Sequence, residues 1–154
     1  ITDADVMVCC GGGGLTSGIA LALAADAPGL RVRPAEPEDF DDVTRSLISG
    51  KIESNVRRGG SLCDAIITPQ PGNLTFPIMR EHCGPGVVVT EDECLRAVGL
   101  AFDRLKVVVE PGGAAALAAA LFHPEQFTGD AVIVVATGGT VDAPVFAKAL
   151  DTLN

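Results

Sequence analysis

Four consecutive glycines, Gly11 to Gly14, are the residues of this sequence with the clearest chemical potential. They follow an apolar run from Val6 to Cys10 and precede the segment LTSGIALALAAD, which is rich in Ala and Leu. A strand, a turn without side chains and a helix N-terminus leave several backbone N–H groups unpaired at the positive end of a helix dipole. Glycines also let a backbone approach a dianion closely and reach positive φ. We therefore expect this turn to bind a phosphate group.

The alternative to a phosphate site is a tight turn between a strand and a helix that holds no ligand. Four glycines between so apolar a strand and so clear a helix favour the phosphate site. The spacing is not GxGxxG, and no GKS or GKT follows the loop. The pattern therefore favours a small phosphorylated cofactor over a nucleotide.

The rest of the chain alternates predicted strands and helices. Unbroken apolar runs are typical of strands inside a parallel sheet, and residues 6–10 and 131–136 fit this pattern best. Thr90 and Glu93 predict a capping box at the start of a helix. Further strands are predicted at 30–35, 62–68 and 87–89, with a strand or extended link at 107–109. Helices are predicted at 15–26, after the acidic residues around Phe40 to about Ser49, at 74–83 (broken or kinked by Pro77), 90–105, 110–122 and from about 142, and a surface loop at 50–61.

This alternation predicts an α/β fold with an open, mostly parallel sheet flanked by helices in a Rossmann-like, three-layer arrangement. All 154 residues should form one domain. In open α/β sheets, ligands bind beyond the carboxyl ends of the strands. The glycine turns after Cys10 and Ala136 should therefore face the same crevice.

Composition and charge exclude several classes of protein. Hydrophobic residues make up 47% of the chain, which excludes disorder, and no apolar run approaches the length of a membrane span. The net charge of −9 and the scattered Lys and Arg argue against nucleic acid and anionic membranes as partners. The five cysteines have no CxxC spacing, so we interpret them as reduced thiols of a cytoplasmic protein.

Six segments occur in a characteristic order: CGGGGLTSGIA, AEPEDFDD, PGNLTFPI, VTEDE, VVEPGGAAALAA and VVATGGTVD. Together they resemble the C-terminal half of the threonine and serine dehydratases, a family that includes serine racemase. These are pyridoxal-phosphate enzymes of the tryptophan-synthase-β type, fold type II. The resemblance implies that the chain is an incomplete large, cofactor-binding domain. The start at Ile1, without Met, agrees with a piece of a longer polypeptide.

The resemblance implies a set of cofactor-binding residues. Thr137 matches the position whose hydroxyl hydrogen-bonds the pyridine nitrogen, a role that needs a neutral donor. Gly72 matches a backbone position beside the cofactor, and Glu110 matches an acidic residue near its ring. From the residues alone, these three could also be a strand-end hydroxyl, a turn glycine and an acid at a helix N-terminus. The loop that holds the cofactor phosphate corresponds to Gly11, Gly12, Gly13, Gly14 and Leu15.

A divalent-cation site present in part of the family corresponds to Glu36, Asp42 and the carbonyl of Phe40. Two carboxylates and a carbonyl suit Mg²⁺ or Ca²⁺, with waters completing the shell. The alternative is an ordinary acidic loop before a helix N-terminus, and the residues leave both open.

The sequence departs from the family in two ways. The usual SGGN after the last strand is TGGT here, so Thr140 replaces a residue that is often Asn. The family's Schiff-base lysine, its substrate-carboxylate loop and most of its small domain precede the matched half. We interpret Lys51, Lys106 and Lys148 as solvated, and we expect His82 and His123 to be structural. This chain should therefore contribute no catalytic lysine.

For the parent enzyme, the resemblance implies dehydration and deamination of L-threonine or L-serine to a 2-oxoacid and ammonia. One alternative within the family is action on 3-hydroxyaspartate or racemisation of serine. An alternative of another class is a non-catalytic phosphate-binding or assembly module. The resemblance also implies that the protein is a homo-oligomer, namely a dimer. It implies further that this chain is inactive without its upstream half.

Overall fold

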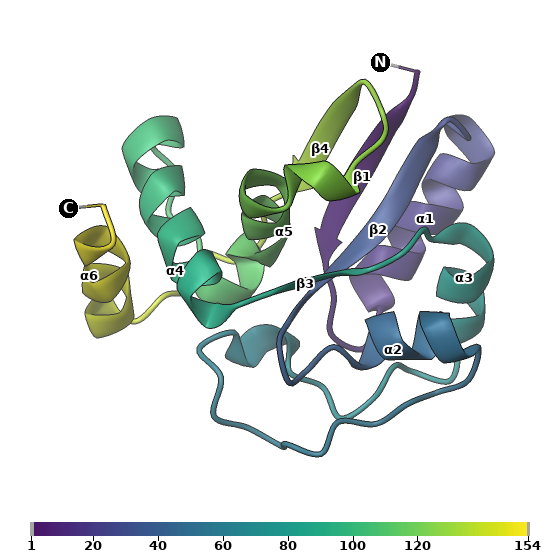
Figure 1. Ribbon diagram of the computed structural model, residues 1–154, viewed down its shortest axis with the longest axis horizontal. Coiled ribbons are helices and arrows are strands. Elements are labelled where there is room, and N and C mark those ends of the chain that lie inside the picture. The colour runs from purple at the N-terminus through teal and green to yellow at the C-terminus, as the bar shows by residue number, and fades with distance from the viewer. Residues whose placement is uncertain (1, 154) are drawn as a thin grey trace.

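The computed structural model describes residues 2–153 and contains a four-stranded parallel sheet in the order β3-β2-β1-β4 (Figure 1). The predicted α/β fold is confirmed. The strands are β1 (Ala4–Cys9), β2 (Leu30–Pro37), β3 (Val87–Val89) and β4 (Ala131–Val135). The α-helices are α1 (Gly14–Asp26), α2 (Asp42–Ser49), α3 (Thr75–His82), α4 (Glu91–Leu100), α5 (Pro111–Phe122) and α6 (Ala143–Asp151).

Helices cover both faces of the sheet. Alternate residues of β1 point to opposite faces, so Val6 and Val8 pack in one cluster with Ala20 of α1, while Met7 and Cys9 pack in another with α4 and α5. Five of the six alanines of α5 are buried, and their small side chains let this helix lie close to the sheet. Figure 1 shows α4 and α6 beyond α5, on the side away from α1.

β1 occupies the centre of the sheet and fixes where the glycine turns lie. It pairs in parallel with β2 on one side and with β4 on the other, with Val8 opposite both Pro34 and Val135. Because the three strands run in the same direction, the turns that follow β1 and β4 leave the sheet at the same edge. The predicted meeting of the two glycine turns is confirmed.

The strand predicted at residues 62–68 is wrong. Residues Asp64–Ile66 form a single 3₁₀ turn, in which Ile66 N donates to the carbonyl of Cys63 at 3.0 Å. Cys63 and Ile66 are buried, three residues apart, whereas Asp64 and Ala65 between them are exposed. This spacing suits a 3₁₀ turn, in which residues i and i+3 share a face, and not the alternation of a strand.

Two helices differ in detail from the prediction, and residues 107–109 take the second of their two predicted alternatives. α3 continues through Pro77, because Pro77 is the third residue of the helix and its missing N–H would have no partner there in any case. The capping box of Thr90 and Glu93 is confirmed, but α4 gives way to a π-helical turn at Ala101–Leu105. Residues 107–109 form an extended link outside the sheet.

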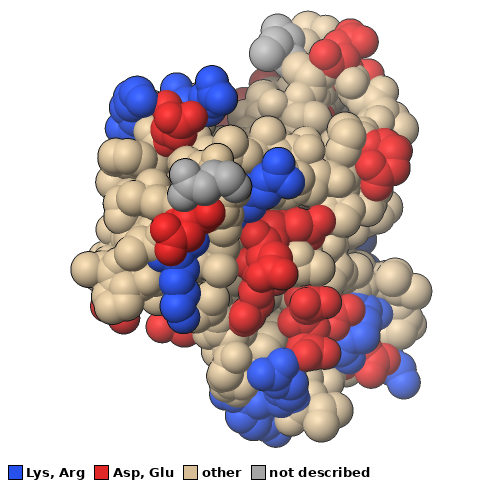
Figure 2. Space-filling model, turned by 60° about the vertical axis from the view of Figure 1, so that its left-hand side comes forward, with Lys and Arg blue, Asp and Glu red and all other residues tan. Residues whose placement is uncertain are grey.

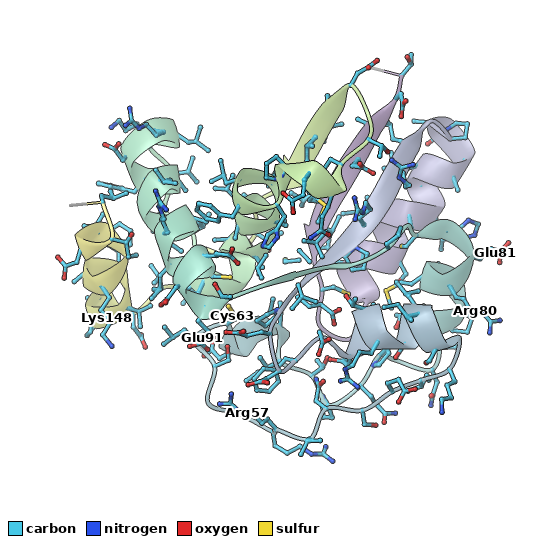
Figure 3. All side chains as sticks on the ribbon, viewed as in Figure 1. Arg57, Cys63, Arg80, Glu81, Glu91 and Lys148 are labelled. Carbon is cyan, nitrogen blue, oxygen red and sulfur yellow. The ribbon has the colours of Figure 1, made fainter. Side chains whose placement is uncertain are left out.

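The surface carries charges of both signs. Figure 2 shows Asp and Glu side chains gathered between groups of Lys and Arg on one face. Lys51, Lys106 and Lys148 are exposed, as predicted. Figure 3 shows Lys148 on α6 at the outer side of the molecule, away from the glycine turn. Within residues 2–153, each helix is too short or too polar to span a bilayer.

Candidate functional site

A cleft of about 270 Å³ lies at the carboxyl ends of β1 and β4. The turn after β1 supplies one wall, the start of α5 and the turn after β4 supply another, and the 3₁₀ turn adds two residues to the lining. The structure therefore brings the predicted phosphate loop, Glu110 and Thr137 to one place. The lining residues are Cys9, Gly11, Gly12, Gly13, Gly14, Leu15, Thr16, Ala65, Ile66, Glu110, Gly113 and Thr137.

The glycine turn presents unpaired backbone donors. Among residues 2–153, nothing accepts a hydrogen bond from the backbone N–H groups of residues 11–16. The first donor of α1 with a partner is Ser17 N, which reaches the carbonyl of Gly13 at 2.9 Å. α1 has no side-chain cap and no acidic residue in its first turn, so the positive end of its dipole is uncompensated. These features suit an anion.

Gly13 gives the turn its shape. Its φ of 88° lies in the left-handed region, and a Cβ there would stand 2.5 Å from Cε of Met79. The turn is held from behind by Gly72, whose N–H donates to the carbonyl of Gly12 at 3.1 Å, and by the hydroxyl of Thr75, which donates to the same carbonyl at 2.5 Å. Gly72 thus supports the turn and is not among the residues that line the cleft.

A buried hydroxyl without a partner lies beside the turn. Thr16 is fully buried, and its Oγ1 has no hydrogen-bond partner among the described residues. A buried polar group is costly to leave unpaired, so such groups commonly mark a place where a ligand or an ordered water completes the structure. Because this atom is enclosed, the open N–H groups of residues 11–16 are the part of the turn that fits a bound phosphate.

Thr137 occupies the opposite wall of the cleft. It lies two residues beyond β4, and its Oγ1 is 2.9 Å from the Sγ of Cys9, the last residue of β1. The backbone of Thr137 is also fixed, because its N–H donates to the carbonyl of Gly113 at 3.3 Å. Burial raises the pKa of the Cys9 thiol, although its hydrogen bond to Thr137 acts in the opposite sense. The thiol therefore stays protonated at neutral pH.

Glu110 immediately precedes α5 and lies against the turn after β4. Its backbone N–H donates to the carbonyl of Gly138 at 2.9 Å. Gly138 has a φ of 65°, and a Cβ there would stand 2.3 Å from Oε1 of Glu110. The Glu110 carboxylate therefore lies over this turn, in the same cleft as Thr137.

The predicted metal ligands lie at the start of α2, outside this cleft. Glu36 is fully buried, and its carboxylate accepts hydrogen bonds from the N–H of Val43 at 2.9 Å and from the N–H and hydroxyl of Thr44 at 2.7 and 2.6 Å. Burial raises the pKa of Glu36 to about 8, and the nearby Asp42 carboxylate adds to this. Glu36 thus serves as a cap for α2 in this structure.

Asp42 is buried beside Glu36, and only half of its carboxylate is satisfied. Its Oδ1 accepts from Nδ2 of Asn55 at 2.6 Å, whereas Oδ2 has no partner among residues 2–153. Burial raises the pKa of Asp42 to about 6. Phe40, which was predicted to offer its carbonyl, is buried two residues away. Within the described part of the chain, no three side chains of His, Cys, Asp or Glu form a metal-binding group.

Sequence reasoning missed several residues of the cleft. Cys9 and Thr16 flank the predicted loop, and their position at a strand end and in the first helical turn could have indicated them. Ala65 and Ile66 were hidden by the wrong strand prediction. Figure 3 shows Cys63, at the start of that turn, beside Glu91 of α4, whose Oε1 accepts from the N–H of Leu62 at 2.7 Å.

Comparison with known proteins identifies the family. The model of the pyridoxal-phosphate-dependent enzyme family matches residues 2–138. The chain belongs to this pyridoxal-phosphate-dependent family. The serine racemase of Dictyostelium discoideum is 38% identical over 144 residues, which cover 92% of this chain and 44% of the relative. An L-threo-3-hydroxyaspartate ammonia-lyase of Pseudomonas sp. is 37% identical over 140 residues, 91% of this chain and 44% of that protein.

Solved structures of pyridoxal-phosphate enzymes share the fold. The threonine deaminase of T.th. superimposes with a TM-score of 0.85 at 38% identity, over 90% of this chain and 49% of the other. The Dictyostelium serine racemase gives a TM-score of 0.81 at 36% identity, over 92% of this chain and 45% of the other. The chain therefore spans about half the length of the relatives that it matches, and the fold is that of fold type II pyridoxal-phosphate enzymes.

Proposed function

We propose that the protein carrying this chain is a pyridoxal-phosphate-dependent ammonia-lyase that converts L-serine or L-threonine to a 2-oxoacid and ammonia. The observation that carries this proposal is the pairing, in one cleft, of the open N–H groups of residues 11–16 with the Thr137 hydroxyl. The names of the relatives, which include ammonia-lyases and a threonine deaminase, support the reaction class.

The residues of this chain have separate roles in that proposal. The N–H groups of residues 11–15 bind the phosphate, helped by the α1 dipole. The Thr137 hydroxyl donates to the pyridine nitrogen, and as a neutral group it supplies no charge to keep that nitrogen protonated. Glu110 lies near the ring, and Gly72 holds the loop through Gly12. When bound, pyridoxal phosphate supplies the electron-withdrawing ring that makes the Cα–H bond of an amino acid acidic.

A neutral ring nitrogen favours elimination over reactions that need a strong electron sink. As a neutral partner of that nitrogen, the Thr137 hydroxyl would therefore favour loss of a β-hydroxyl. This argument applies equally to L-serine, L-threonine and 3-hydroxyaspartate, each of which carries a β-hydroxyl. The names of the relatives support two second candidate activities: action on 3-hydroxyaspartate and racemisation of serine.

A divalent cation beside α2 is part of the proposal. Oδ2 of Asp42 is buried and unpartnered among the described residues, and Mg²⁺ or Ca²⁺ would satisfy it. The Glu36 carboxylate and the carbonyl of Phe40 would complete the protein ligands. Because Glu36 lies in β2 and Asp42 begins α2, the cation would brace the loop between them and not take part in the reaction. We also propose a homodimer, by analogy with the family.

The experiment uses the full-length protein that carries this chain. It measures pyridoxal phosphate binding by absorbance, and then 2-oxoacid, ammonia and D-serine from L-serine, L-threonine and L-threo-3-hydroxyaspartate. We expect cofactor binding, and 2-oxoacid formed fastest from serine or threonine. Fastest turnover of hydroxyaspartate would move the assignment to the second candidate. Binding of inorganic phosphate without pyridoxal phosphate would favour the non-catalytic module.

A further inference from the structure

Cys9 and Thr137 form a contact that joins the two walls of the cleft. They are 128 residues apart in the chain, and Sγ lies 2.9 Å from Oγ1. Cys9 closes β1 directly before the phosphate turn, and Thr137 follows the neighbouring strand β4. Both residues line the cleft, but Cys9 is only 5% exposed. The thiol therefore lies behind the hydroxyl, on the side of the protein core.

The chemistry of the two groups decides which of them donates. Burial raises the pKa of Cys9, so the sulfur carries its proton and can donate. A hydroxyl oxygen accepts a hydrogen bond better than a sulfur atom does, because the sulfur of a thiol is a weak acceptor. The favoured arrangement is thus Cys9 S–H donating to Oγ1 of Thr137.

The direction of this bond controls what Thr137 can offer a ligand. A threonine hydroxyl has one proton and two lone pairs. If Oγ1 accepts from Cys9, the hydroxyl proton is free to point into the cleft. If the hydroxyl instead donated to sulfur, only a lone pair would face the ligand, and a pyridine nitrogen there would have to be protonated.

We propose that Cys9 is a positioning residue, whose thiol donates to Thr137 and so commits the Thr137 hydroxyl proton to the ring nitrogen of bound pyridoxal phosphate. The inference rests on the proposed function. It adds that the thiol of Cys9, which lies in the core behind Thr137, controls the protonation state of the ring. Without the thiol, the hydroxyl can rotate toward another acceptor in the cleft, such as the Glu110 carboxylate.

The test is the nitrogen-15 NMR signal of pyridoxal phosphate labelled at its ring nitrogen and bound to the full-length protein. The wild-type signal should be that of a neutral, hydrogen-bonded pyridine. Cys9→Ala should move the signal toward that of a pyridine without a hydrogen bond, and raise the cofactor dissociation constant about fivefold. Cys9→Ser, which keeps a donor, should restore both. Cys9→Val fills the site without a donor and replaces Cys9→Ala if that variant does not fold.

The controls separate this inference from the proposed function. Cys94→Ala removes a similarly buried thiol of α4 in the same core and should leave the signal unchanged. Thr137→Val should shift the signal as Cys9→Ala does. If Thr137→Val shifts it and neither Cys9→Ala nor Cys9→Val does, the role of Cys9 is wrong and the proposed function stands. A protonated wild-type nitrogen, or no effect of Thr137→Val, would overturn this inference and leave the proposed function standing, whereas no cofactor binding would overturn both.

Discussion

Gly113 of α5 and Thr137 after β4 lie so close together that a Cβ on Gly113 would stand 1.4 Å from the Thr137 carbonyl oxygen. The N–H of Thr137 also donates to the Gly113 carbonyl. Only a residue without a side chain allows this approach, so Gly113 sets the position of the turn that carries Thr137. The helix behind the cleft thereby locates a hydroxyl inside it.

Gly113→Ala should therefore disturb both folding and the cleft. The methyl group must push the Thr137 turn away from α5, and we expect the free energy of unfolding to fall by about 3 kcal/mol. The matched control is Gly112→Ala, because a Cβ there meets nothing closer than 3.4 Å. Urea denaturation followed by circular dichroism measures both. Equal stability of the two variants would contradict the close approach.

Gly14 and Gly18 give a test of the phosphate turn. They lie one helical turn apart on α1, and a Cβ at either meets nothing within 4 Å, but only Gly14 lines the cleft. Gly14→Ala should leave stability unchanged or higher, and weaken pyridoxal phosphate binding by the full-length protein at least about tenfold, because the methyl group crowds the anion. Gly18→Ala should not alter affinity. Fluorescence titration with pyridoxal phosphate measures the affinity of each variant. Equal affinities of Gly14→Ala and Gly18→Ala would argue against a phosphate at this turn.

Glu36 should be important for stability whether or not a metal binds. Glu36→Ala leaves the N–H groups of Val43 and Thr44 and the Thr44 hydroxyl without their acceptor in a buried place. We expect the free energy of unfolding to fall by about 2 to 4 kcal/mol. Glu38→Ala, at an exposed position two residues on, is the control and should change it by less than about 0.5 kcal/mol. Chemical denaturation compares them.

The native thiols should react slowly. Burial raises the pKa of Cys9 and Cys10, and that of Cys83 to about 11, from the ordinary 9.0. At pH 7 a thiol with that pKa has roughly one hundredth of the thiolate of an unperturbed one, and thiolate is the reactive form. Mass spectrometry after iodoacetamide treatment should show slow labelling of Cys83 that rises with pH up to about 11, and fast labelling in urea. Rapid native labelling near pH 7 would contradict this.

The sequence predicted the frame of the fold because its signals were local and strong. The runs ending at Cys10 and Ala136 are apolar enough to be interior strands, and Thr90 with Glu93 marks a helix start that the structure contains. The strand prediction for residues 62–68 is wrong because the adjacent Ile66 and Ile67 resemble the apolar run of a strand. The buried residues, Cys63 and Ile66, are instead three apart. The true shape of this stretch depends on packing against α5 and on the hydrogen bond from the Leu62 N–H to Glu91, which a local pattern does not contain.

The candidate site, like the fold, could be predicted from the sequence only in part. The glycine turn could be predicted because unpaired N–H groups follow from a strand, glycines and a helix in sequence. The contact of Cys9 with Thr137 could not, because it depends on β1 and β4 being neighbours across 128 residues. Nor could sequence decide whether Glu36 caps α2 or binds a cation, since a carboxylate before a helix suits both roles.

The cation proposed beside α2 can be tested with two adjacent aspartates. Oδ2 of Asp42 is buried without a partner among the described residues, whereas Asp41 is partly exposed and pairs with Arg45 at 3.1 Å. At pH 9, above the pKa of about 6 that burial gives Asp42 and that of about 8 for Glu36, both carboxylates are charged and suited to Mg²⁺ or Ca²⁺.

Either ion, at roughly ten times its dissociation constant, should therefore raise the Tm by about 4 °C. Asp41→Asn should keep this response, because it leaves the Asp42 carboxylate and its unpartnered Oδ2 in place. Asp42→Asn should lose it, because the amide removes the charge that offsets dehydration of the ion. Differential scanning calorimetry with and without EDTA measures the shift. If Asp42→Asn responds as the wild type does, Glu36 and Asp42 form only the buried cap of α2, and the ion binds elsewhere.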